Sequence, residues 1–242
     1  MKKTYVFLLA GLAITGCSKH DPILPGTRHD IFDTNDVYVT NQAVPELSLT
    51  AKNIYGDEKC DYRQDATNTI WAGDKKIYSG FVMDSVVQSN QSPVCVGQSV
   101  YTGLSTGEVI KINSLNNKIV WVADVFSGTN LTGGASVVDI VAHVAIDGKY
   151  LYAGGLGNTF CKLSAYNGNK IWCVNISVPV DFIIVDNFAF VVGGDNNLYA
   201  INTDNGKIYW ACSVKKQVAP KYNGNAIIVG KQKIDYKNGK LI

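Results

Sequence analysis

The sequence predicts an all-β protein, and three observations point to this class. The chain of 242 residues contains 23 Gly and 13 Tyr but only 6 Pro, and 17% of its residues are charged. Many glycines and aromatic side chains with few charges are typical of strands joined by tight turns, and a hydrophobic share of 46% excludes a disordered chain. The body also repeats one strand–turn–strand phrase, and its tryptophans recur at similar spacing.

Residues 1–16 are predicted to be a lipoprotein signal peptide. A basic start at Lys2 and Lys3 precedes an apolar run from Thr4 to Ile14, which is too short to span a bilayer. Small residues before Cys17 resemble a bacterial lipobox, in which the cysteine is acylated, as with palmitate, and becomes the mature N-terminus. The alternative is a plain signal peptide with an incidental cysteine. Resemblance to Gram-negative lipoproteins implies that Ser18 directs the chain to the outer membrane, with the body on the periplasmic face.

The charge balance excludes two kinds of partner. The chain has 22 Lys+Arg and 20 Asp+Glu, and removal of residues 1–16 with Lys2 and Lys3 leaves it neutral. Nucleic acid and anionic lipid head groups both attract proteins with a basic surplus. We therefore expect no nucleic-acid partner, and we expect attachment to the membrane through lipid on Cys17.

Two parts follow the signal peptide. Residues 17–45 hold Pro22, Pro25 and Pro45 without hydrophobic periodicity, which predicts a lipidated cysteine and a flexible tether. Residues 46–242 are predicted to form the folded domain. Within this domain three segments each contain a strand, a glycine turn, an alternating strand, an Asn/Gly turn and a strand ending in Trp; they are residues 97–121, 148–172 and 187–210.

The tryptophans predict the architecture. They are spaced by 50, 51 and 38 residues, which fits one four-stranded module per tryptophan and therefore the blades of a β-propeller, about four in number. Trp71 is interpreted as the last strand of an incomplete blade, and residues 238–242 resemble the phrase before Trp210. A propeller closed by its N-terminal strand fits this pattern, and so does an incomplete arc. The four are expected to be structural packing residues: Trp71, Trp121, Trp172 and Trp210.

No catalytic, metal or cofactor site is predicted from the residues. His20 and His29 lie in the tether, and His143 lies in an apolar stretch where a core or surface role is more usual than that of a base. The sequence has no nucleophile elbow, no paired Cys-x-x-Cys and no phosphate-binding loop before a helix. We therefore expect a non-enzyme without cofactor or metal.

The cysteines other than Cys17 are odd in number, so at least one is expected to stay unpaired within the chain. A hairpin turning near Gly168 would place Cys161 and Cys173 diagonally, which favours two small buried side chains over a disulfide. A periplasmic location would permit bridges, so pairing stays open among Cys60, Cys95, Cys161, Cys173 and Cys212.

The repeat phrase resembles the PQQ-type propeller repeat, best at residues 198–210 and next at residues 163–172. With the anchor and tether, and with the segment Leu24-Pro25-Gly26-Thr27-Arg28, the chain resembles the BamB family of outer-membrane-assembly lipoproteins as a short or truncated member. This resemblance implies a scaffold. Its partners would be the periplasmic domains of the barrel-inserting subunit of the β-barrel assembly machinery, and nascent outer-membrane proteins.

Two alternatives stay open. One is a remnant of a PQQ-dependent quinoprotein dehydrogenase, although the chain lacks the vicinal cysteine pair and the length of that family. The other is an envelope lipoprotein that binds an unrelated ligand, such as a glycan. The sequence does not predict partner-binding loop residues or the oligomeric state.

Overall fold

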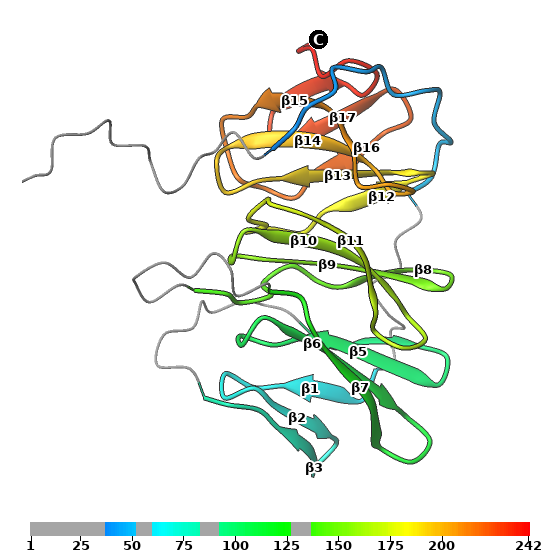
Figure 1. Ribbon diagram of the computed structural model, residues 1–242, viewed down its shortest axis with the longest axis vertical. Coiled ribbons are helices and arrows are strands. Elements are labelled where there is room, and N and C mark those ends of the chain that lie inside the picture. Colours follow the sequence, from blue (N-terminus) through cyan, green and yellow to red (C-terminus); the bar gives the residue numbers. More distant parts are fainter. Residues whose placement is uncertain (1–36, 52–59, 83–91, 127–136) are drawn as a thin grey trace, which may run out of the picture. The chain divides into compact units, whose positions relative to one another are not determined.

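The structure is a computed structural model that describes residues 37–51, 60–82, 92–126 and 137–242. Within these ranges every regular element is a strand, and the strands are paired in antiparallel order (Figure 1). No helix long and apolar enough to cross a membrane occurs among these residues. The predictions for residues 1–36, including the signal peptide, Cys17, His20 and His29, lie outside the described residues.

The strands form five sheets, which we number in chain order. Sheet 1 contains β1 (Tyr62–Gln64), β2 (Thr69–Ala72) and β3 (Lys75–Ser79). Sheet 2 contains β4 (Val94–Val96), β5 (Ser99–Gly103), β6 (Glu108–Asn113) and β7 (Lys118–Asp124). Sheet 3 contains β8 (Ala145–Asp147), β9 (Tyr150–Gly155), β10 (Thr159–Ser164) and β11 (Lys170–Val174). Sheet 4 contains β12 (Ile183–Val185), β13 (Phe188–Val192), β14 (Asn197–Asn202) and β15 (Ile208–Ser213). Sheet 5 contains β16 (Lys221–Tyr222), β17 (Ala226–Val229) and β18 (Gln232–Asp235).

Sheets 2, 3 and 4 confirm the four-stranded module that the sequence predicts. Each is a meander in which neighbouring strands pair through short turns. The turns from the first to the second strand place Gly97, Gly148 and Asp186 at positive φ, a backbone region that glycine enters without the Cβ penalty and that Asp tolerates. In each of these sheets the pairing between the third and fourth strands shifts by one residue, directly after the pair that contains the tryptophan.

Buried side chains join each sheet to the next one along the chain. Ile70 of sheet 1 packs with Val100 and Ile110 of sheet 2. Further clusters join sheets 2 and 3, sheets 3 and 4, and sheets 4 and 5 in the same way. None of these four clusters, which include only described residues, joins sheet 1 to sheet 5. The sheets therefore form a series in chain order, each stabilised by its neighbours.

The register corrects the predicted ends of the body. Trp71 was expected in the last strand of an incomplete blade, but it lies in the middle strand β2, between Arg63 of β1 and Lys76 of β3. Tyr78 of β3 holds the repeat position of the blade tryptophans, because it pairs with Ile70 one step before the register shift. The N-terminal strands thus form a sheet of their own, so of the two alternatives, closure by this strand and an incomplete arc, the described strands fit the arc. The tryptophans indicated about four blades, and the described residues form five sheets, of which three have four strands and two have three.

The C-terminal residues start a fourth strand in sheet 5. Leu241 forms a bridge with Ile234 of β18, and the Ile242 N–H donates to the Lys233 carbonyl at 3.0 Å. This agrees with the resemblance of residues 238–242 to the phrase that precedes Trp210. Gly239 at φ 72° takes the glycine position of that phrase.

Residues 37–50, which we call the N-terminal segment, lie against the sheets, although the sequence assigns residues up to 45 to the tether. Val39 forms a parallel bridge with Ile208 of β15, and the Thr40 and Gln42 N–H groups donate to the carbonyls of β15 at 2.9 Å. Val44 is buried in the cluster between sheets 4 and 5.

Candidate functional site

Three of the four predicted tryptophans occupy one repeat position. Trp121, Trp172 and Trp210 lie in the outer strands β7, β11 and β15, each paired with the residue that precedes the register shift. Each ring rests on the glycine of the Asn/Gly turn in the next sheet; a Cβ on Gly206 would lie 3.0 Å from Trp172. This contact explains the recurrence of both residues in the phrase. Their position between sheets fits the packing role expected from the sequence.

Two of the three indole N–H groups at this position add a hydrogen bond between sheets, whereas Nε1 of Trp121 is buried without a hydrogen-bond partner among the described residues. Nε1 of Trp172 donates to the Thr203 carbonyl, and Nε1 of Trp210 donates to the Tyr236 carbonyl, both at 2.9 Å. Trp71 differs, since its Nε1 donates to Asp65 within sheet 1. That Asp65 carboxylate also accepts from Thr67 and Thr69, and these hydrogen bonds lower its pKa to about 2 against the opposing effect of burial. Trp71 therefore stabilises its own hairpin.

Lysines between the sheets were missed by the sequence analysis. Lys162 is only 5% exposed, and its Nζ donates to the Thr203 carbonyl at 2.8 Å and lies 3.8 Å from the Tyr150 ring centroid. Burial lowers the Lys162 pKa, against the attraction of Asp204 and Asp147. Lys111 holds the same repeat position in sheet 2 and donates to the Ala165 carbonyl at 2.8 Å. A lysine between apolar residues in two aligned repeats was the available signal.

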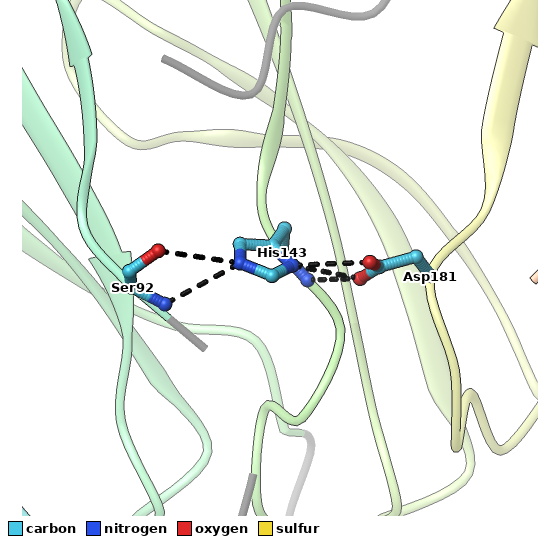
Figure 2. Close-up of polar contacts among 3 residues, drawn as sticks. All are labelled: Ser92, His143 and Asp181. Atoms are coloured by element: carbon cyan, nitrogen blue, oxygen red, sulfur yellow. Dashed lines mark hydrogen bonds and ion pairs between the residues drawn. The ribbon is translucent and has the colours of Figure 1, made fainter. Parts of the chain in front are cut away.

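A polar cluster connects three successive sheets, as Figure 2 shows. Ser92, His143 and Asp181 each lie two residues before the first strand of sheets 2, 3 and 4. His143 Nδ1 is 3.1 Å from both carboxylate oxygens of Asp181, and the His143 backbone N–H donates to Asp181 at 2.7 Å. On the other side, Nε2 lies 3.4 Å from both the backbone nitrogen and Oγ of Ser92. The sequence showed only a lone histidine because these residues come from three distant segments.

The electrostatics of this cluster follow from the carboxylate. The hydrogen bond to Asp181 raises the His143 pKa, against the opposing effect of burial. The same contact lowers the Asp181 pKa, although burial acts in the opposite direction. In its neutral form the imidazole fits this geometry by donating from Nδ1 to Asp181 and accepting at Nε2.

The order serine, histidine, aspartate matches that of a nucleophilic triad, but the geometry favours a structural link. A general base needs the Nε2 lone pair for the serine hydroxyl. Here the Ser92 N–H donates to Nε2 from the same distance as Oγ, 3.4 Å, so the hydroxyl shares that lone pair with the backbone. Both contacts are long for hydrogen bonds to nitrogen or oxygen. We interpret the cluster as a structural polar contact between the segments that precede the first strands of three sheets.

The cysteines form two disulfides, one of which contradicts the expectation from sequence. Cys60 is bonded to Cys95, which ties the start of sheet 1 to β4. The sequence favoured separate thiols for Cys161 and Cys173 and left their pairing open, but they are directly opposed on β10 and β11 and form a disulfide. The favoured interpretation was wrong because Gly168 is the last residue of the turn and because the register shifts between Lys162 and Leu163. Among the described residues Cys212 is the free cysteine, and burial raises its thiol pKa to about 11, so it is poorly reactive.

No metal centre is evident in the described part of the chain, where no three His, Cys, Asp or Glu side chains come together to hold an ion. The surface instead offers apolar strand edges. The outer strand β7 exposes Ile119, Val120 and Val122 by 44%, 49% and 42%. We call these three residues and their outward-facing backbone groups the β7 edge. An exposed apolar strand edge is a site for contact with another chain.

The sequence and the fold are both similar to those of known proteins. The family model described as "Outer membrane protein assembly factor BamB" matches residues 64–212. The protein of that name from Legionella pneumophila is 24% identical over 60% of this chain and 38% of its own length. The Bordetella pertussis protein of the same name is 26% identical over 54% of this chain and 35% of its own length. The chain thus spans less than half the length of these relatives.

A solved structure agrees with the sequence matches. The crystal structure of BamB from Moraxella catarrhalis superposes with a TM-score of 0.62 at 15% identity. The match covers 75% of this chain and 59% of that chain. At this identity the likeness supports the fold, namely a propeller-type series of three- and four-stranded sheets. The repeats, the sheets and the family match together lead to one conclusion: the chain belongs to the family of the outer membrane protein assembly factor BamB.

Proposed function

We propose that this protein is a non-enzymatic lipoprotein scaffold that assists the assembly of β-barrel outer-membrane proteins. The observation that carries the proposal is the family match over residues 64–212, whose curated relatives are named as outer membrane protein assembly factors. The fold suits this work, since sheets held together by buried clusters, tryptophans and lysines present rigid loops and edges to partners.

The proposal includes the location. Residues 1–16 would direct export and be removed, and acylated Cys17 would anchor the chain in the outer membrane on its periplasmic face. Fractionation of cells tests this part. Wild-type protein is expected in the outer-membrane fraction, and the Cys17→Ser variant in the soluble periplasmic fraction. A Cys17→Ser variant that stays in the outer-membrane fraction would contradict lipid anchoring.

The partners proposed are the periplasmic domains of the barrel-inserting subunit and nascent outer-membrane proteins. Affinity capture of the tagged full chain from detergent-solubilised envelopes, after mild cross-linking, tests the first partner. Recovery of the barrel-inserting subunit is the expected result. A tagged outer-membrane lipoprotein of unrelated fold, expressed at the same level, is the control. Equal recovery with that control, or none with the full chain, would overturn the scaffold function.

A further inference from the structure

The outer strands of four sheets can be compared at one repeat position, the first pair beyond the register shift. The residue there is Lys76 in β3, Ile119 in β7, Lys170 in β11 and Ile208 in β15. Since the strands share one register, the position faces the same kind of surroundings in each sheet. The residue type at this position can therefore be compared with what covers or protects each outer edge.

Strand β15 has its outer edge covered by the chain itself. The N-terminal segment runs parallel to it, with Thr40 N–H donating to the Ile208 carbonyl and Gln42 N–H to the Tyr209 carbonyl, both at 2.9 Å. Val37 and Val39 pack against the cluster that contains Ile208. Ile208 is consequently only 3% exposed. The molecule thus shows how an added strand is bound at this edge.

Strands β3 and β11 protect their edges by charge. Lys76 and Lys170 are exposed and occupy the position that Ile208 holds in β15. A lysine on an edge strand disfavours the addition of an apolar strand, because its ammonium group would have to leave water. These two edges are therefore unsuited to bind an apolar segment.

The outer edge of β7 is neither covered by the N-terminal segment nor protected by a lysine at this position. Ile119 holds the position and is 44% exposed, against 3% for the covered Ile208. Among the described residues, none donates a hydrogen bond to the outer edge of β7. With seven residues, β7 is also the longest of the described strands. The β7 edge therefore has the apolar character of the occupied edge, and no described segment covers it.

The occupied edge indicates what the β7 edge would bind. In the N-terminal segment the inward Val37 and Val39 alternate with Tyr38, which is 78% exposed. Residues 37–44 carry no charge. On β7 the charged side chains, Lys118 and Asp124, stand only at the two ends. An occupant of matching chemistry is an extended, uncharged segment of alternating hydrophobicity.

We propose that the β7 edge binds an extended, uncharged segment of alternating hydrophobicity as an added strand, through the carbonyls of Ile119 and Val120. These carbonyls correspond in register to those of Ile208 and Tyr209, which accept hydrogen bonds from the N-terminal segment. Strands of outer-membrane barrels alternate in this way before they insert. The inference deepens the proposed scaffold function and rests on it for the source of the segment.

A peptide-binding measurement tests the proposal. The probe is a fluorescent synthetic peptide with the sequence of residues 37–44, and the protein is the full chain in detergent. Fluorescence anisotropy is expected to show saturable binding. Ile119→Lys, which places on β7 the lysine found in β3 and β11, is expected to weaken binding at least about tenfold, as is peptide N-methylation at the residues copied from Thr40 and Gln42.

The matched control is Ile171→Lys on β11, where Ile171 is 47% exposed. It adds the same charge to an edge already protected by Lys170, so peptide affinity is expected to stay within about twofold. Equal urea midpoints for both variants and the wild type establish that folding is intact. Unchanged binding by Ile119→Lys, or equal loss in both variants, would overturn the proposal.

Two further outcomes are separable. Sedimentation that shows a dimer dissociated by Ile119→Lys would mean that a second copy occupies the edge, which contradicts the proposal. Capture of the barrel-inserting subunit by Ile119→Lys, with peptide binding never observed, would overturn the β7 site and leave the scaffold function standing. Peptide binding without capture of that subunit would overturn the scaffold function and leave the β7 site standing.

Discussion

At the scale of single residues, the contact between sheets depends on glycines at positive φ. Gly206 has φ 73°, and a Cβ there would lie 3.0 Å from the Trp172 ring. Gly148 has φ 59° but open space around the Cβ position. Both positions require a positive φ, but only Gly206 contacts a tryptophan ring. The cost of a Cβ at positive φ and the cost of displacing the ring can therefore be measured separately.

Gly206→Ala is expected to destabilise the protein more than Gly148→Ala. Both variants carry the cost of a Cβ at positive φ, about 1–2 kcal/mol. Gly206→Ala adds the displacement of the Trp172 ring, and overpacking of this kind costs about 1–3 kcal/mol. Urea denaturation of the two variants measures the difference. Equal losses would mean that the ring contact does not constrain this position.

The His143–Asp181 contact is expected to depend on pH. The raised His143 pKa means a stabilisation present below the unfolded pKa and lost as pH rises through the folded pKa. The lowered Asp181 pKa means a stabilisation present above the unfolded pKa and lost as pH falls through the folded one. The charged pair therefore contributes most between the ordinary aspartate and histidine pKa values, roughly pH 4 to 6.5.

Asp181→Asn is accordingly expected to cost more stability at pH 5.5 than at pH 8.5. Because Asp181 is 37% exposed, solvent screens the pair, and the difference is expected to be about 0.3–1 kcal/mol. Urea midpoints at the two pH values measure it, and Ser92→Ala, which leaves the carboxylate in place, is the control. A larger cost at pH 8.5 would contradict the assigned charge states.

At the scale of elements, the register of the third and fourth strands decides which residues meet. The shift beyond the tryptophan aligns Cys161 with Cys173 and places Lys170 opposite Leu163. A bulge of one residue moves side chains to the opposite face, and the sequence does not show which side of the turn carries it. For this reason the sequence predicted the strands and the tryptophan position but missed the disulfide.

The same limit explains the other differences from the sequence analysis. Trp71 has the residue type of a blade tryptophan but lies in β2, and only pairing with β1 and β3 reveals this. Ser92, His143 and Asp181 meet because each lies two residues before the first strand of one of three successive sheets, which periodicity in one segment cannot indicate. The strands and turns of each repeat were predictable, whereas the register within a hairpin and most contacts between sheets were not.

The Cys161–Cys173 disulfide is expected to stabilise the hairpin of β10 and β11. The bridge closes a loop with a sequence separation of 12, for which loss of the constraint costs about 2–3 kcal/mol. Cys173→Ser is expected to lower the free energy of unfolding by this amount, as judged by urea denaturation. Cys212→Ser, at the free cysteine, is the control and is expected to show little change. Equal effects of the two substitutions would argue against the bridge.

At the scale of the whole molecule, the N-terminal segment joins the last two sheets. Val44 and Leu47 are buried in the cluster that also contains Phe190 of sheet 4 and Ile227 of sheet 5. Leu49, two residues further on, is 80% exposed. The segment therefore contributes to the core from outside the repeats, as a cover for β15 and a link to sheet 5.

Leu47→Ala is expected to destabilise the protein by about 2–4 kcal/mol, because the leucine is 7% exposed and its removal leaves a cavity. Leu49→Ala makes the same chemical change at an exposed site and is expected to cost less than about 0.5 kcal/mol. Thermal or urea unfolding compares the two. Similar costs would mean that residues 37–50 act as a free tether.

The scaffold account is tested most directly by photo-cross-linking in living cells, with a photoreactive residue at Val120 of the β7 edge and, as control, at Tyr166, which is 82% exposed. The account predicts pulse-labelled adducts between position 120 and newly exported outer-membrane proteins, which disappear during the chase as those proteins assemble. It predicts no such adducts from position 166. Absence of adducts at position 120, or adducts equal at both positions, would contradict a scaffold that receives strands of assembling barrels.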